Sequence, residues 1–405
     1  MTLGEPSDTS LGELARLFLK LGTIAFGGPA AHIAMMEDEV VRRRGWLTRE
    51  QFLDYLGATN LIPGPNSTEL AIHVGHARGG WPGLLVAGSC FILPAALIVG
   101  AVAWAYVRFG AMPQVAGILY GVKPVVIAIV LQAGWGLGRS AVKSVTLGVL
   151  AVAAVTAVAV GVNELIVLVG AGVVMALLHL APAPHGGTGA SLLALWRESA
   201  GVRRPSSSTA TVSSAVAAAA TGAVAAATPF SLWLLFGTFL KIGAVLFGSG
   251  YVLLAFMRAD LVERLGWLTE RQLLDAVAVG QVTPGPVFTT ATFVGYLLGV
   301  ATGAVVATVG IFLPAFVFVA LSGPLVPRLR RSPTAGVVLD GVNVASLALM
   351  TVVTWQLGRA AIVDPLTIVL AAVSGALLWR YRPNSAWLVL GGALAGLART
   401  LWLPM

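Results

Sequence analysis

The sequence contains one set of short glycine- and proline-bearing blocks twice, in the same order. Gly45-Trp46-Leu47-Thr48 returns 221 residues later as Gly266-Trp267-Leu268-Thr269, and Pro63-Gly64-Pro65 returns at the same offset as Pro284-Gly285-Pro286. From Leu93-Pro94-Ala95 onward the offset is 220. A duplicated chain with Gly/Pro interruptions at corresponding places is typical of transporters, whose binding site lies where the two repeats meet.

The composition places both copies in a membrane. Of 405 residues, 57% are hydrophobic and 10% are charged, which is more apolar surface than one soluble core can bury. We therefore expect an all-α polytopic protein with the lipid bilayer as its main partner. Apolar stretches of about the 20 residues that a crossing needs lie at 81–107, 115–133, 145–162, 165–180, 299–322, 336–356, 366–379 and 386–402.

Several function classes have no support in the sequence. Cys90 is the only cysteine, which excludes an intrachain disulfide and a thiolate metal cluster within one chain. No nucleotide-binding glycine motif or nucleophile elbow is present, so we expect no enzyme activity, no cofactor and no metal. The net charge of +8 comes from bases in short loops, which favours retention on the cytoplasmic side over nucleic-acid binding. The acidic N-terminal segment does not resemble a cleaved signal peptide.

Three regions follow from the repeat. We expect the first repeat at 11–181, a linker at 182–228 that is rich in proline, glycine and serine, and the second repeat at 229–405. The end of the linker, 212–228, is alanine-rich and uncharged, and its roughly 17 residues reach the lower limit for a crossing.

Loop charges indicate that the two halves have opposite orientations. Arg139 and Lys143 make one loop of the first half basic, whereas in the equivalent loop of the second half Arg359 is opposed by Asp364 and the neighbouring loops are basic instead. This pattern predicts an inverted repeat, which needs an odd number of crossings between equivalent helices. If 212–228 supplies the extra crossing that makes the number odd, we expect about 6+1+6 segments, with the N-terminus inside and the C-terminus outside.

The first two segments of each half fit less well with the preference of Lys and Arg for cytoplasmic loops. Two full crossings would place Arg42, Arg43 and Arg44 outside. Interrupted or re-entrant segments would remove the conflict. Gly27-Gly28-Pro29 and Pro63-Gly64-Pro65 lie where such breaks are expected, because proline lacks an amide donor and clashes with the preceding turn.

Lysines are the first candidates for substrate binding. Lys20 and Lys241 occupy the same repeat position, and Lys241 is the only charged residue between Pro205 and Met257. A charge in such an apolar run is a functional candidate by default. The alternatives are a side chain that reaches the membrane interface or, for Lys20, a solvated helix face. Lys123, whose repeat counterpart is Asn343, is a third candidate with the same alternative.

The broken segments are the second group of candidates, since they would expose helix N-termini whose free amides favour anions. Neutral donors flank them, and ordinary capping of the freed backbone is the alternative role for each. With the lysines, these elements suit a small dianion. The substrate-binding residues expected here are Gly27, Gly28, Pro29, Asn60, Pro63, Gly64, Pro65, Asn66, Gly248, Ser249, Gly250, Gln281, Thr283, Pro284, Gly285 and Pro286.

Glu69 follows the first Pro-Gly-Pro block, and the second half has threonine at that place. A single carboxyl group in a membrane segment is a candidate for carrying a coupled proton. Pairing with Lys20, Arg78 or a histidine is the alternative.

The combination of Phe26-Gly27-Gly28-Pro29, Arg44-Gly45-Trp46-Leu47-Thr48 and two Pro-Gly-Pro blocks resembles the chromate ion transporter family, over both halves. The resemblance implies a two-domain transporter of a bacterial or archaeal cytoplasmic membrane that exports chromate, confers chromate resistance and draws on the proton gradient. Sulfate, a near-isosteric dianion, is the implied competitor, and a homodimer is compatible with the sequence. Gly248-Ser249-Gly250 departs from the first motif, so the two breaks need not contact substrate equally.

Other readings remain open at this point. A sulfate or other oxyanion carrier would differ in competition, and a passive anion channel would carry flux that ignores the proton gradient. A membrane reductase is disfavoured by the single cysteine and the lack of a cofactor motif.

Overall fold

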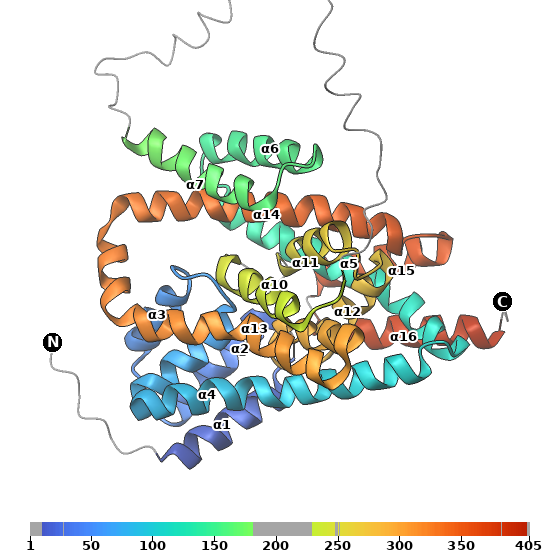
Figure 1. Cartoon of the computed structure of the whole chain (residues 1–405), viewed down its shortest axis with the longest axis horizontal. Coiled ribbons are helices and arrows are strands. Elements are labelled where there is room, and N and C mark those ends of the chain that lie inside the picture. The colour runs from blue at the N-terminus through green and yellow to red at the C-terminus, as the bar shows by residue number, and fades with distance from the viewer. Residues whose placement is uncertain are drawn as a thin grey trace, which may run out of the picture.

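The computed structural model describes residues 10–26, 28–180, 229–247, 250, 252–381 and 383–402, and every regular element within these ranges is a helix (Figure 1). The first half contains α1 (Leu11–Ile24), α2 (Gly28–Glu37), the π-helical turn η1 (Asp38–Arg43), α3 (Arg49–Thr59), α4 (Asn66–Phe109), α5 (Pro113–Ala141), α6 (Val145–Ala159) and α7 (Glu164–Leu180). The second half contains α10 (Leu232–Val245), α11 (Leu253–Met257), η2 (Arg258–Arg264), α12 (Glu270–Val282), the short 3₁₀ turn η3 (Val287–Thr289), α13 (Thr290–Arg331), α14 (Pro333–Ala361), α15 (Pro365–Arg380) and α16 (Ser385–Trp402). The two sets correspond in order, with η3 and α13 together equivalent to α4. The expected linker, with its extra helix at 212–228, lies outside the described residues.

The repeated Gly-Trp-Leu-Thr blocks start equivalent helices. Thr48 begins α3 by accepting a hydrogen bond on its hydroxyl from the Gln51 amide, while the Gln51 side chain accepts one from the Thr48 amide. Thr269 and Gln272 make the same reciprocal cap for α12. Each cap satisfies two amide donors that a helix start leaves free. The two threonines therefore mark equivalent helix starts.

Helices α4 and α13 each fold back on themselves. The backbone leaves helical geometry at Gly79-Gly80 and at Gly299-Val300, where Gly80 and Val300 have φ of 58° and 52°. The arms on either side run antiparallel, since the hydroxyls of Thr292 and Thr308 lie 2.7 Å apart. At 1.5 Å per residue the first arm of α4, 66–78, is about 20 Å long, which is shorter than the roughly 30 Å hydrocarbon core of a membrane.

The structure has membrane-length apolar helices in both halves, and the chain is an integral membrane protein. Among the described residues, four helical segments are long and apolar enough to cross a bilayer: Asn66–Phe109, Pro113–Ala141, Val287–Ser322 and Pro333–Ala361. They include the stretches expected at 81–107, 115–133, 299–322 and 336–356. Large apolar side chains such as Trp81, Trp104, Val145 and Trp402 point outward, as a lipid-facing surface requires.

The two halves exchange helices. Helices α15 and α16 pack on α5 of the first half, and α6 and α7 pack on α14 of the second. The crossings are close: a Cβ added at Gly121 would lie 1.9 Å from the Gly392 carbonyl oxygen, and one at Gly341 would lie 2.6 Å from that of Ala171. Glycine lets helix backbones approach in this way.

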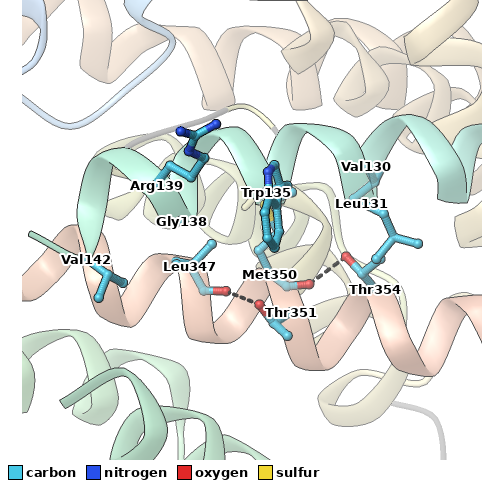
Figure 2. A pocket seen from close by; sticks show the side chains of 11 residues that line it. Val130, Leu131, Trp135, Gly138, Arg139, Val142, Leu347, Met350, Thr351 and Thr354 are labelled. Carbon is cyan, nitrogen blue, oxygen red and sulfur yellow. Dashed lines mark hydrogen bonds between the residues drawn. The ribbon is translucent and has the colours of Figure 1, made fainter. Parts of the chain in front are cut away.

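The equivalent helices α5 and α14 lie side by side and run antiparallel (Figure 2). A Cβ added at Gly138, late in α5, would touch Leu347, in the middle of α14. One added at Gly358, late in α14, would touch Ile127, in the middle of α5.

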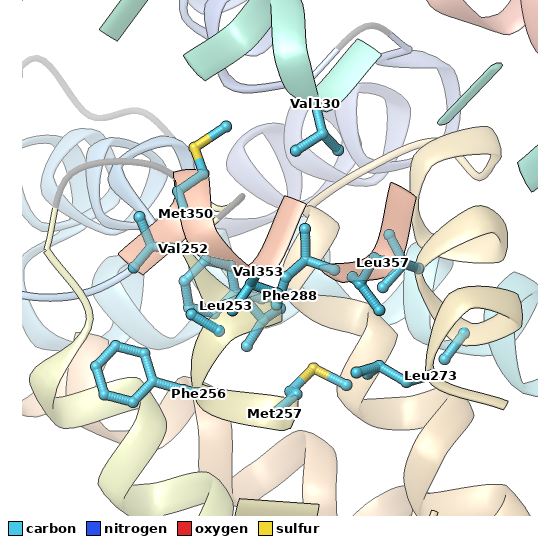
Figure 3. Close-up of a cluster of buried hydrophobic side chains, with 14 of the residues drawn as sticks. Val130, Val252, Leu253, Phe256, Met257, Leu273, Phe288, Met350, Val353 and Leu357 are labelled. Atoms are coloured by element: carbon cyan, nitrogen blue, oxygen red, sulfur yellow. The ribbon is translucent and has the colours of Figure 1, made fainter. Parts of the chain in front are cut away.

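The main core lies beneath this helix pair and is built largely from the second half. Figure 3 shows Leu253, Phe256 and Met257 of α11 and Leu273 of α12 gathered with side chains of α14. A separate cluster between α1 and the two arms of α4 holds the first half together. Consequently α12 is enclosed, whereas α3, its equivalent, packs mainly on α4.

Candidate functional site

The two Pro-Gly-Pro turns cross between the halves in a reciprocal way. The Gly64 amide donates to the Leu246 carbonyl over 2.8 Å, and the Gly285 amide donates to the Ala25 carbonyl over 2.9 Å. Ala25 and Leu246 are the equivalent residues that end α1 and α10. Both glycines have positive φ, 139° and 85°, a region that favours glycine. Each turn therefore sits against the broken segment of the other repeat.

A cavity of about 160 Å³ lies at this crossing, and both halves contribute to its wall. The broken elements predicted from the sequence meet here: Pro29 and Pro65 face Gly250 and Pro286. The complete wall consists of Pro29, Pro65, Asn66, Ser67, Leu137, Gly250, Pro286, Val287 and Phe288.

The polar part of this wall comes from the first half. Helix α4 starts at Asn66 after Pro65, whose carbonyl accepts hydrogen bonds from the amides of Thr68 and Glu69. The amides of Asn66 and Ser67 come before that first turn closes, so the positive end of the helix points at the cavity wall. The equivalent positions in the second half are the apolar Val287 and Phe288. The site is thus asymmetric although the fold is duplicated.

His32, which the sequence did not single out, orients Ser67. The ring is buried, with Nε2 3.0 Å from the Ala25 carbonyl oxygen and Nδ1 3.3 Å from the Ser67 hydroxyl. A carbonyl oxygen can only accept, so Nε2 carries the hydrogen and Nδ1 of the neutral ring accepts from Ser67. This link ties the start of α4 to the end of α1. The repeat gave little indication of His32 in the sequence, because the second half has Leu253 at the equivalent position.

A second, more polar cavity of about 320 Å³ adjoins the first, and Asn66 and Leu137 belong to both walls. Asn60 and Asn66 line it, and Nδ2 of the Asn66 side chain donates to the Asn60 side-chain oxygen over 2.8 Å. Lys143 and Asp340 form an ion pair of 2.8 Å in its wall. We call this space the open vestibule, because exposed residues such as Asn60 and Lys143 border it.

The groove between α5 and α14 drawn in Figure 2, of about 400 Å³, differs from these cavities. The hydroxyls of Thr351 and Thr354 in it donate to carbonyls of their own helix, Leu347 and Met350. Trp135 lies largely exposed along the same groove. Such a surface suits lipid better than an anion.

Glu69 lies one turn into α4 and is fully buried. Within the described part of the chain, neither of its carboxylate oxygens has a hydrogen-bond partner. A Cβ added at Gly64 would lie 2.2 Å from Oε1, so the carboxyl group occupies the space that glycine leaves open. At the corresponding place the Thr290 hydroxyl donates to the Val287 carbonyl, which is the capping role considered for the flanking donors.

The two repeat lysines are paired in the same way. Lys20 Nζ lies 2.7 Å from Glu39 Oε1, and Lys241 Nζ lies 2.6 Å from Asp260 Oδ1. The Lys20 hydrogen bond holds the pKa of Glu39 below its ordinary value. The offset of 221 that relates the lysines also relates Glu39 to Asp260, so this pairing was available in the sequence and was missed.

Neither lysine is among the residues that line the two adjoining cavities. Their role as substrate ligands therefore stays a prediction.

Lys123 pairs across the two halves. Its Nζ lies 2.8 Å from Asp275 Oδ1, and the Tyr106 hydroxyl donates to Asp275 Oδ2 over 2.8 Å. Lys123 and Asp275 are 9% and 1% exposed.

The other expected ligands are dispersed. Gln281 is buried near the end of α12, and Thr283 lines an apolar cavity between α12 and α5. Gly28 begins α2 with φ of 76°, and Pro63 and Pro284 flank the crossing glycines. Gly27, Gly248 and Ser249 lie outside the described residues.

Membrane-length helices in two related halves, with a small cavity at their crossing, define an integral membrane protein of the transporter class. The chain belongs to the chromate transporter family, whose model matches residues 12–177 and 233–397. It is 33% identical to the chromate transport protein of Cupriavidus metallidurans, over 96% of this chain and 93% of that one. It is 32% identical to the chromate transport protein of Pseudomonas aeruginosa with the same coverage. It is 28% identical to a probable chromate transport protein of Synechococcus elongatus, over 91% and 96%. No solved structure matches the chain.

Proposed function

We propose that this protein carries chromate across the cytoplasmic membrane and binds the dianion in the cavity at the crossing of the two repeats. The observation that carries the proposal is the composition of that cavity's wall, in which the broken segments of both halves meet the start of α4. The family relationship and the names of the relatives support chromate as the cargo.

The cavity offers several modest contacts for an anion. The amides of Asn66 and Ser67 and the side chain of Asn66 supply donors, and the positive end of α4 adds electrostatic attraction. A transport site must release its ion as well as bind it, which favours such contacts over one deep cationic trap. Because sulfate has the same charge and nearly the same shape, we expect it to compete.

The arrangement of helices supports an inverted repeat. Helices α5 and α14 are equivalent, membrane-length and antiparallel, so if both cross the bilayer, the two halves have opposite orientations. The odd crossing that this requires is the one predicted from the sequence at residues 212–228, which lie outside the described residues. With the short first arms of α4 and α13 as re-entrant elements, we propose the 6+1+6 arrangement, with the N-terminus inside.

We assign the coupled proton to Glu69. A buried ionised carboxylate without a partner is costly, whereas a neutral carboxyl group is not. Glu69 is also three residues from Asn66, so a change in its charge acts directly on the anion site. Proton entry then drives chromate outward and confers resistance.

Uptake of radiolabelled chromate into inverted membrane vesicles tests this function. We expect uptake when the vesicle interior is acidic, since a proton leaving the vesicle then drives chromate in, and inhibition by excess sulfate. Equal flux with and without the gradient would identify a passive channel instead. Flux of sulfate without chromate would identify a different oxyanion carrier, and a change in chromium valence would identify a reductase.

A further inference from the structure

The two repeats are in different states, and equivalent residues of α3 and α12 show this most clearly. Asp54 on α3 is exposed, whereas its equivalent Asp275 on α12 is 1% exposed. Asn60 at the end of α3 is exposed and borders the open vestibule, whereas its equivalent Gln281 is buried. The region around Asp275 and Gln281, which is equivalent to the open vestibule, is therefore closed, and we call it the closed face.

The Lys123–Asp275 pair stands at the closed face. Asn343, the repeat counterpart of Lys123, lines the open vestibule. Lys123 itself reaches from α5 of the first half to α12 of the second, and Tyr106 of α4 binds the other oxygen of the same carboxylate. One buried carboxylate thus holds three helices together.

The arrangement around Asp275 is that of an oxyanion site with its anion in place. The Lys123 ammonium forms an ion pair of 2.8 Å with one carboxylate oxygen, and the Tyr106 hydroxyl donates a hydrogen bond of 2.8 Å to the other. Both donors belong to the first half, and only the anion belongs to the second. An outward shift of α12 to the position that α3 has would leave the two donors in place and remove the carboxylate from them.

We propose that Lys123 and Tyr106 form a second binding station for the transported dianion, and that Asp275 occupies this station while the closed face is shut. The proposal rests on the proposed transport of an oxyanion. Opening the face exchanges one anion for another at Lys123, so the lysine is never left buried without a partner, which would be strongly unfavourable. Return of Asp275 displaces the cargo and closes the face.

An apolar cavity of about 320 Å³ lies beside the pair and gives α12 room to move. Tyr106 and Val122 line it from the first half, and Val279 of α12 and Thr283 directly after that helix line it from the second. An apolar void next to a closed ion pair is a poor path for an anion, so the route opens only when α12 shifts.

Thiol labelling tests the station, with Cys90→Ser as background. Gln281→Cys reports on the closed face, and Asn60→Cys reports on the open vestibule at the equivalent position. Sulfate, which does not oxidise thiols, is the probe anion. We expect position 281 to react slowly in the otherwise unchanged protein and position 60 to react readily.

Asp275→Asn removes the resident anion and leaves the station free. Loss of a charge-assisted contact is worth at least about tenfold, so position 281 should react at least about tenfold faster, and sulfate should slow the reaction again. In Lys123→Gln/Asp275→Asn, position 281 should react fast and sulfate should give no protection. Asp38→Asn, which breaks the exposed 2.7 Å pair with Arg43, is the control and should not alter labelling at position 281.

Tyr106→Phe keeps both charges paired and so provides a test without a buried unpaired charge. It should raise reactivity at position 281 by about two- to tenfold, since one hydrogen bond is lost. Unchanged labelling in these variants, or faster labelling of Asp275→Asn without protection by sulfate, would overturn the station. Uptake of chromate or sulfate by the wild-type protein is measured in parallel, because its absence would overturn the proposed function instead.

Discussion

The crossing of the repeats makes Gly285 a sensitive position. In Gly285→Ala, the backbone keeps a φ of 85°, which costs a non-glycine residue about 1–2 kcal/mol. The new Cβ would lie 2.6 Å from the Ala95 Cβ and 3.0 Å from the Gly22 carbonyl oxygen, and overpacking of this kind costs about 1–3 kcal/mol. Together these effects predict a loss of about 2–5 kcal/mol in the free energy of unfolding.

Gly45→Ala is a matched control. Gly45 has a φ of 60°, yet a Cβ there would meet nothing within 4 Å, so only the backbone cost of about 1–2 kcal/mol applies. Thermal unfolding of the purified proteins in detergent compares the two, and vesicle uptake reports on function. We expect Gly285→Ala to melt clearly below Gly45→Ala and to transport poorly, because the 2.9 Å bond to Ala25 is displaced. Equal melting temperatures and normal uptake would refute the reasoning.

Three further predictions concern charged residues. Glu69→Gln keeps the shape of the side chain and removes the titrating group, so chromate uptake should lose its dependence on the proton gradient. If the dependence is retained, a group other than Glu69 carries the coupled proton. Lys241→Ala removes one of the two ion pairs that buried Asp260 makes among the described residues and leaves the one with Arg264, and it should abolish chromate resistance while the protein still inserts; normal resistance removes Lys241 from the site. Lys20 holds the pKa of Glu39 below its ordinary value of 4.5, so this stabilisation is complete above that value and is lost as the pH falls through the lower folded pKa. Melting temperatures recorded against pH should therefore show Lys20→Met below the wild-type protein above the ordinary pKa of Glu39, with the difference shrinking as the pH falls through the lower folded pKa, and identical curves would contradict the pairing.

The sequence was informative wherever both repeats carry the same local chemistry. The threonine caps of α3 and α12 could be predicted because a capping box is a local sequence pattern. The long membrane spans could be predicted because the length of an apolar stretch is also a local property of the sequence. The meeting of Pro29 with Gly250 at one cavity followed from the duplication itself.

Features that depend on long-range contacts or occur in one repeat were not predictable. The exchange of α15 and α16 onto α5 is set by glycine contacts between distant segments, such as Gly121 with Gly392. The fold-back of α13 was hidden because Val300 replaces the glycine found in α4. The buried pair of Lys123 and Asp275 has no counterpart in the other repeat, so the offset could not reveal it.

The central claim is that the cavity at the crossing of the repeats holds the oxyanion. Anomalous diffraction at the chromium absorption edge, from crystals grown with chromate, would test this most directly. We expect a chromium peak between Asn66 and Ser67 on one side and Gly250 and Pro286 on the other. A cavity that stays empty at saturating chromate, with chromium bound only at surface arginines, would contradict the account.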